Sequence, residues 1–110
     1  MSWNVVYTAG ARHDLRGIYE YIAYDLLAPE TAAGQVQRII KEIRALDEMP
    51  MRFQLYNEEP WRSAGLHFFP VDNYFVFYLP DEPKNTVNIV RIMYIGRDVR
   101  RQLNETKMEY

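Results

Sequence analysis

The stretch that decides the fold lies between residues 11 and 46 and reads ARHDLRGIYEYIAYDLLAPETAAGQVQRIIKEIRAL. Apolar residues recur in it every three or four positions, the spacing that lines one face of a helix. Pro29 divides the stretch, because a proline ends one helix and suits the first turn of the next. The pattern predicts two amphipathic helices, near residues 10–27 and 30–48, joined as an antiparallel hairpin. The apolar positions are Ala11, Leu15, Ile18, Ile22 and Leu26, then Ala32, Val36, Ile39, Ile43 and Leu46.

Strand-like segments lie on both sides of this hairpin. Residues 3–8 and 86–94 are rich in β-branched and aromatic residues, and residues 74–79 are apolar at every position, as is typical of a central strand. Residues 66–71 form a further candidate, in which Pro70 favours an edge or a bulge. The remaining segments are predicted as a loop (51–65), a turn (80–85), a short last helix (97–104) and a loose tail (105–110).

The expected fold is therefore α+β with the order β-α-α-β-β-β. Each helix is apolar on one face only, so it needs a sheet to cover. We expect an antiparallel sheet with the N-terminal helical hairpin packed on one face and a concave opposite face. The chain of 110 residues has room for one hydrophobic core, which predicts a single domain over residues 1–110.

Composition excludes several classes of protein. The chain has no cysteine, which excludes disulfides and cysteine-based zinc sites, and it has no Gly-rich phosphate loop, His-Glu-x-x-His or calcium loop, so we expect neither metal nor cofactor. It has no long apolar run and no secretory signal at its start, so we expect no membrane contact and a cytoplasmic location. The net charge of −2 counts against a protein that grips nucleic acid through many phosphates.

The basic charge is nevertheless concentrated near the last predicted strand. Arg91, Arg97, Arg100 and Arg101 stand against a single acid, Asp98, within residues 86–101, which predicts an anion site there. A guanidinium offers a planar fork of donors that suits phosphate. The alternative is a structural salt bridge, and the sequence leaves the two readings open.

Further candidates for such a site or for its rim are Tyr94, His67 and the pair Trp61-Arg62. Tyr94 lies beside the arginines. His67 shares a strand face with Phe69 and Val71, and it acts either as a general acid or base or as a half-exposed strand residue. His13 is expected on the solvated side of the first helix. The pair Trp61-Arg62 fits a stacking surface or a plug at the end of the sheet.

Three segments carry a combined pattern over residues 3–103. The first contains Tyr7 with Ala9 and Ala11, then Asp14-Leu15-xx-Ile18-xx-Tyr21-Ile22, Pro29-xx-Ala32 and Ile43-xx-Leu46-xx-Met49-Pro50. The second is Pro70-Val71-Asp72-Asn73-Tyr74-Phe75-Val76-Phe77-Tyr78. The third is Val87-x-Ile89-Val90-Arg91-Ile92-x-Tyr94-xx-Arg97-Asp98-xxxx-Leu103. In this order and spacing the chain resembles the RelE/ParE superfamily of bacterial toxins. The resemblance implies the toxin of a type II toxin–antitoxin system, held inactive by a cognate antitoxin.

The resemblance leaves the target open. RelE-like members cleave messenger RNA on the ribosome without a metal, whereas ParE-like members poison DNA gyrase and are not nucleases. Phe68, Phe75 and Leu103 stand about where RelE has its catalytic lysine, arginine and tyrosine, so its basic cluster is largely missing. The preferred hypothesis is a ribosome-dependent mRNA endonuclease that uses Arg97, Arg91, Tyr94 and His67. The alternatives are a non-enzymatic gyrase inhibitor and an inactive interaction module with the same fold.

Overall fold

A computed structural model describes residues 2–96 and 98–106 of the chain. Its elements, in chain order, follow the predicted β-α-α-β-β-β plan with additions. They are β1 (Asn4–Tyr7), α1 (Ala9–Glu20), a π-helical turn (Tyr21–Asp25), α2 (Pro29–Arg44), two 3₁₀ turns (Ala45–Asp47 and Pro50–Arg52), β2 (Gln54–Leu55), α3 (Trp61–Ala64), β3 (His67–Val71), β4 (Tyr74–Asp81), β5 (Thr86–Tyr94) and α4 (Val99–Asn104).

The strands form one five-stranded sheet in the order β1-β5-β4-β3-β2. Strands β2 to β5 pair antiparallel, as expected, but β1 runs parallel to β5, so that the sheet is mixed. Side-chain patterns report which face of a strand is buried and not its direction, so the sequence could not distinguish the two pairings. The α+β fold class itself is confirmed.

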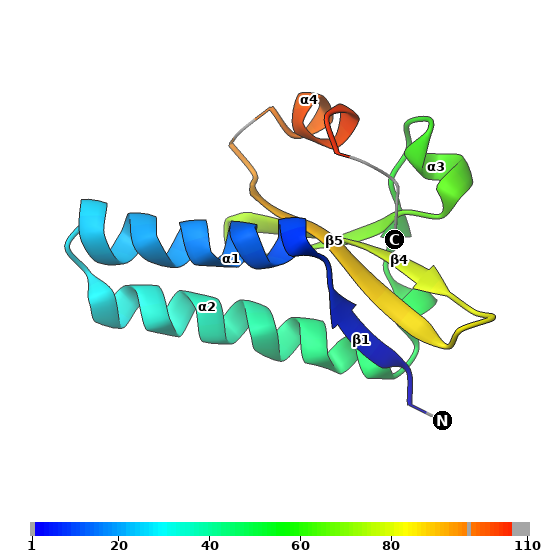
Figure 1. Cartoon of the computed structure of the whole chain (residues 1–110), viewed down its shortest axis with the longest axis horizontal. Coiled ribbons are helices and arrows are strands. Elements are labelled where there is room, and N and C mark those ends of the chain that lie inside the picture. Colours follow the sequence, from blue (N-terminus) through cyan, green and yellow to red (C-terminus); the bar gives the residue numbers. More distant parts are fainter. Residues whose placement is uncertain (1, 97, 107–110) are drawn as a thin grey trace.

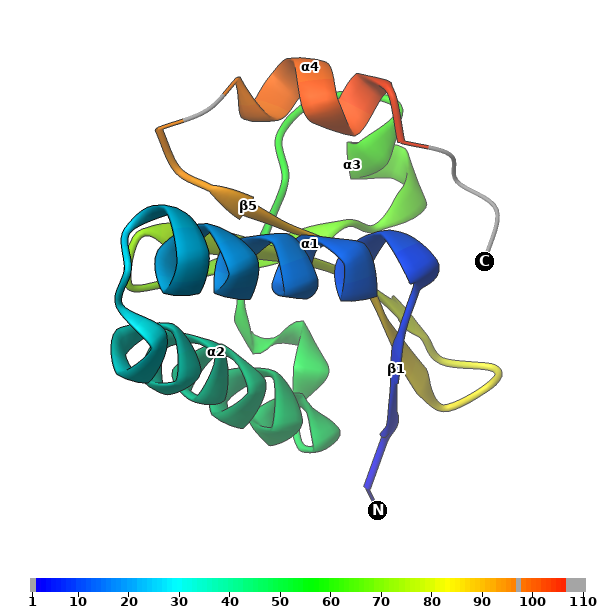
Figure 2. The ribbon, with the colours of Figure 1, turned by 60° about the vertical axis from the view of Figure 1, so that its left-hand side comes forward.

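The two helical layers lie on opposite faces of the sheet (Figures 1 and 2). The hairpin of α1 and α2 covers one face, where Ile39, Ile43 and Leu46 pack against Val76, Tyr78 and Ile89. The opposite face, expected to be open and concave, is covered by α3 and α4. Trp61 and Leu103 bring these short helices onto it, in a second cluster with Phe77, Val90 and Met93.

Residues 51–65 were expected to form a loop and instead contain β2 and α3. Both elements are too short, at two and four residues, to show a periodic pattern. The burial of Trp61 fixes α3 in place, since its side chain is only 2% exposed. The position of Trp61 therefore matches the prediction of a plug, whereas Arg62 beside it is exposed.

Two apolar residues lie elsewhere than their spacing predicts. The spacing predicts Leu26 on the buried stripe of the first helix, yet Leu26 is exposed. The π-helical turn contains about one residue more than an α-helical turn, so the residues after Tyr21 are rotated around the helix axis by about one position. An unbroken alternation along the strand would place Val90 on the same face as Ile92, yet Val90 packs with Met93. The cause is a bulge: Ile89 pairs with Tyr78 and Arg91 with Phe77, leaving Val90 as an extra residue.

Tyr78 sits at the centre of the face covered by the hairpin and is fully buried. Its hydroxyl donates a hydrogen bond of 2.6 Å to the backbone carbonyl of Pro50, which anchors the segment leading to β2. Burial raises the pKa of the Tyr78 hydroxyl above its ordinary value of 10.0. The folded chain thus holds this proton more tightly than the unfolded chain does.

We predict that stability falls as the pH rises above about 10, where unfolded tyrosines lose their protons and folded Tyr78 does not. Below that pH the contribution is fully present. Tyr78→Phe should lower the free energy of unfolding at pH 7 by about 1–2 kcal/mol, since the Pro50 carbonyl loses its donor, and should weaken the fall above pH 10. Urea unfolding at neutral and alkaline pH measures both effects.

Exposed Tyr24→Phe is the control and should change neither effect. If Tyr78→Phe left the alkaline fall in stability unchanged, the buried Tyr78 hydroxyl would not be its cause.

Candidate functional site

Arg91, a predicted phosphate ligand, is held by a carboxylate of the chain itself. Its guanidinium donates to both oxygens of Asp14, from Nε to Oδ2 at 2.7 Å and from Nη2 to Oδ1 at 2.9 Å, and Nη1 donates to Thr106 Oγ1 at 3.0 Å. The Asp14 side chain is only 10% exposed and that of Arg91 21%. The bidentate side of the fork, which a phosphate would use, is therefore occupied.

Asp14 also binds the backbone of β5, on the side where that strand lacks a neighbour. Strand β1 ends at Tyr7, paired with Ile89, so the rest of β5 has no strand beyond it. Two side chains take the place of the missing strand: the Thr8 hydroxyl donates to the Val90 carbonyl at 3.0 Å, and Asp14 Oδ2 accepts from the backbone N–H of Ile92 at 2.8 Å. The start of α1 thus completes the hydrogen bonding of β5.

The other arginines of the predicted cluster are paired as well, where they are described. Arg100 contacts Glu58 at 2.9 Å, and Arg101 contacts Glu105 at 3.3 Å, both on the exposed surface. Asp98 does not pair with Arg91; it caps α4 by accepting the backbone N–H of Arg101. Arg97 lies outside the described residues. The local excess of basic charge read from the sequence is therefore largely neutralised by Asp14, Glu58 and Glu105.

Asp72 pairs with an arginine outside the predicted cluster. It accepts hydrogen bonds from Arg38 Nε at 2.8 Å and from Gln35 at 2.9 Å, which tie the turn between β3 and β4 to α2. The bond from Arg38, followed by that from Gln35, lowers the pKa of the Asp72 carboxyl. This acid therefore belongs to the contact between sheet and hairpin.

Tyr94 and Arg91 point to opposite faces of the sheet. Tyr94 pairs with Tyr74 and shares the hairpin-covered face with Ile92, whereas Arg91 pairs with Phe77 on the face covered by α3 and α4. The Tyr94 side chain is 48% exposed and meets the Tyr74 ring edge-on, with 5.8 Å between ring centres. A Cβ on Gly96 would lie 2.5 Å from the Tyr94 ring, so a larger residue at that position would require the exposed ring to move.

His67 lies far from Tyr94 on the sheet. It shares a face with Phe69 and Val71, as the alternation predicted, and its ring packs 5.5 Å from Tyr78 while Nδ1 contacts the Gly65 carbonyl at 2.9 Å. His67 pairs with Tyr78 on one side of β4, and Tyr94 pairs with Tyr74 on the other. Tyr74 and Tyr78 are four residues apart, which corresponds to roughly 13 Å along β4. Strands β3 and β5 are two strand spacings apart, which corresponds to roughly 10 Å across the sheet. The two side chains cannot share one phosphate.

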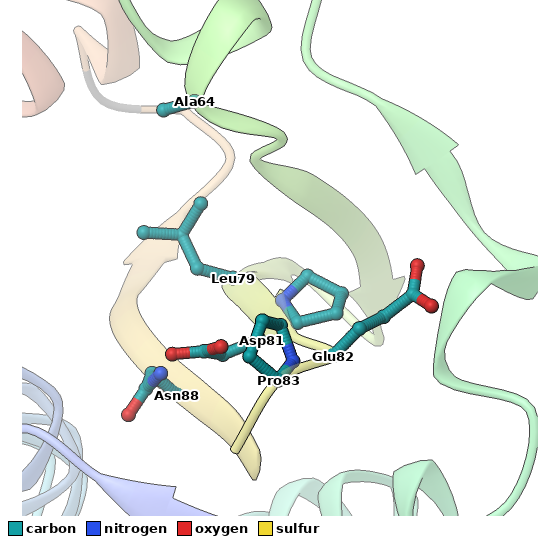
Figure 3. Close-up of a pocket in the computed structure, with 7 residues that line it drawn as sticks. Ala64, Leu79, Asp81, Glu82, Pro83 and Asn88 are labelled. Atoms are coloured by element: carbon teal, nitrogen blue, oxygen red, sulfur yellow. The ribbon is translucent and has the colours of Figure 1, made fainter. Parts of the chain in front are cut away.

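Of two hollows on the surface, one is lined by two basic and two acidic side chains, Arg38 and Lys41 with Glu42 and Asp72. The other lies beside the turn from β4 to β5 and carries Asp81 and Glu82 with Asn88 and no basic side chain (Figure 3). The two carboxylates point apart in that view. Within residues 2–96 and 98–106 no group of three or more His, Asp or Glu side chains is placed to hold a metal ion. None of the helices described combines the length and apolar character of a membrane span.

Asp14 is the residue that sequence reasoning missed. A signal was available, since Asp14 lies three residues after Ala11 and four before Ile18, both on the buried side of α1. An acid at that position needs a basic partner or a backbone donor. The sequence does not identify Arg91 as that partner, because 77 positions separate the two residues.

The family described as the ParE toxin of the type II toxin–antitoxin system parDE matches residues 5–99. No curated protein matches in sequence. Among solved structures, the chromosomal ParDE system from P. aeruginosa superposes with a TM-score of 0.72 at 20% identity, covering 86% of this chain and 98% of that one.

Two further structures share the fold. The toxin–antitoxin complex RelBE2 from Mycobacterium tuberculosis gives a TM-score of 0.60 at 23% identity, covering 86% of this chain and 92% of that one. A mutant of the E. coli toxin RelE in the free state gives 0.64 at 12% identity, covering 96% and 94%. At these identities the likeness shows a common fold.

The geometry predicts that Arg91 and Asp14 act in stability. Asp14→Ala should lower the free energy of unfolding by about 3 kcal/mol, because it leaves a largely buried guanidinium and the Ile92 N–H without their acceptor. Chemical denaturation measures the change. Asp25→Ala, at an exposed site without an ion pair in the described part of the chain, is the control and should change stability by less than about 0.5 kcal/mol. Equal small effects would show that the pair is not structural.

Proposed function

The chain belongs to the ParE toxin family of type II toxin–antitoxin systems, and from this premise we propose that it poisons DNA gyrase by protein contact. Both ParE-like inhibition and RelE-like cleavage were open from the sequence. The choice between them rests on one observation, the absence of an assembled phosphate site among the described residues. The nuclease preferred from the sequence becomes the second candidate.

Cleavage of RNA without a metal needs several donors close to one phosphate. The developing charge is stabilised only by groups already aimed at it, and a general base must lie within hydrogen-bond reach of its proton. Here Arg91 is occupied by Asp14, Tyr94 projects from the opposite face, and His67 lies roughly 16 Å from Tyr94. This separation supports a function that does not use these residues as a catalytic group.

The endonuclease reading retains one supporting feature. Tyr94 is half exposed at the exit of β5, and Arg97 follows it by three positions in the chain. These two residues are the remaining candidates for a phosphate contact and proton transfer on the ribosome. In that reading Arg97→Ala would lower the cleavage rate by about 10²–10³.

We also propose that a cognate antitoxin holds the toxin inactive in the cytoplasm. Two of the structural neighbours come from toxin–antitoxin systems, a ParDE and a RelBE2. This chain exposes apolar side chains at β2, the edge strand of the sheet, and just before it, with Leu55 45% and Met49 75% exposed. An edge strand beside apolar side chains suits an added extended segment of the partner.

The two targets separate in one induction experiment. Inhibition of gyrase predicts DNA breaks and filamentation in induced cells, with a reporter messenger that stays intact by primer extension. Purified chain should also trap gyrase-dependent breaks in plasmid DNA. New messenger ends without DNA breaks would establish the nuclease instead, and Arg97→Ala then tests its site. Harmless induction would favour an inactive module.

A further inference from the structure

The tip of the helical hairpin, residues 20–30, lies at the end of α1 and α2 farthest from β1 (Figures 1 and 2). It exposes apolar and aromatic side chains. Tyr24 is 65% exposed and Leu27 83%, and Tyr21 and Leu26 are each more than half exposed. Ile22 and Ala23 between them are buried. The tip is therefore an apolar surface on a firmly packed base.

The local backbone holds these side chains in a fixed arrangement. In the π-helical turn the Leu26 N–H donates to the Tyr21 carbonyl at 3.1 Å, so the two residues lie one turn apart on the same side. The Tyr24 ring meets Tyr19 edge-on, with 6.4 Å between ring centres. Leu27 adopts a φ of 55°, a left-handed conformation in which asparagine or glycine is less strained than leucine.

The same tip carries a one-sided charge. Residues 17–37 contain Glu20, Asp25 and Glu30 and no lysine, arginine or histidine, so this segment has a charge of −3 in a chain whose total is −2. All three carboxylates are exposed, and the ion pairs found within residues 2–96 and 98–106 involve other acids. The tip is thus an acidic surface with aromatic rings.

We propose that the hairpin tip is the surface that docks on gyrase, at a basic surface beside the DNA that this enzyme holds; the inference rests on the proposed function. An enzyme that grips DNA through its phosphates displays clustered Lys and Arg. Carboxylates pair with such cations, and the faces of Tyr21 and Tyr24 attract them. Leu27 supplies an apolar contact of the kind that anchors interfaces. Nucleic acid is repelled by the tip, so the occupant is protein.

The charge component is tested by binding of the purified chain to immobilised gyrase. The tip variant Glu20→Gln, Asp25→Gln, Glu30→Gln should bind about tenfold more weakly than the wild type and lose most of the salt dependence between about 0.05 and 0.2 M. The matched control is Glu42→Gln, Glu48→Gln, Glu82→Gln, which removes the same charge from exposed positions elsewhere. This control should bind like the wild type.

The apolar component is tested by Tyr24→Ser combined with Leu27→Asn. Both side chains are exposed, and asparagine tolerates the left-handed backbone, so the variant should unfold at the wild-type temperature. It should nevertheless bind gyrase at least tenfold more weakly while it retains binding of the antitoxin. Circular dichroism of both variants separates loss of contact from loss of fold.

Each other outcome overturns the inference in a recognisable way. Equal weakening by tip and control variants would mean a general charge effect. Unchanged binding by both tip variants would leave the gyrase target intact and remove the tip from the interface. Tip variants that lose antitoxin binding or self-association while still binding gyrase would assign the surface to those occupants. A wild-type chain that neither binds nor traps gyrase would contradict the proposed function itself, and the tip inference with it.

Discussion

The arrangement depends on one carboxylate, that of Asp14, which accepts from Arg91 and from the backbone of Ile92. Strand β5 lies between β1 and β4 and pairs along its whole length only with β4, since β1 stops at Tyr7. Without Asp14 and Thr8, the second half of β5 would present unpaired backbone groups beside a helix. Asp14 therefore joins the helical hairpin to the centre of the sheet, and its position in α1 fixes how the two layers meet.

The ion pair of Asp14 is one of several that change where the net charge of the molecule lies. The arginines near the end of the chain form a basic cluster in the sequence, but Asp14, Glu58 and Glu105 neutralise the described ones in place. The acids at the hairpin tip receive no such partners in the described part of the molecule. Among the described residues, the basic charge of this region is thus balanced by acids, and the distinct electrostatic feature is an acidic tip.

Features that depend on residues close together in the sequence could be predicted, whereas features that depend on residues far apart could not. Helix positions such as Ile39 and Ile43, and the apolar central strand β4, are set by local spacing and were predicted correctly. The parallel direction of β1, the bulge at Val90 and the Arg91–Asp14 pair depend on residues far apart in the chain, which periodicity does not report. The candidate site depends on the same long-range information, because residue type and proximity in sequence place Arg91 and Tyr94 together while strand alternation separates them.

The π-helical turn connects the fold to the tip. A continuous α-helix would have carried Leu26 onto the buried stripe with Ile18 and Ile22, where burial of a leucine contributes about 2 kcal/mol. The extra residue in the turn rotates Leu26 outward instead and is followed by Leu27 in a left-handed conformation. Leu26 therefore lacks the stabilisation that burial would give, and Leu27 adopts a strained backbone conformation. Exposed apolar side chains held at a cost to stability are characteristic of binding surfaces, so the tip is best understood as a contact that a partner completes.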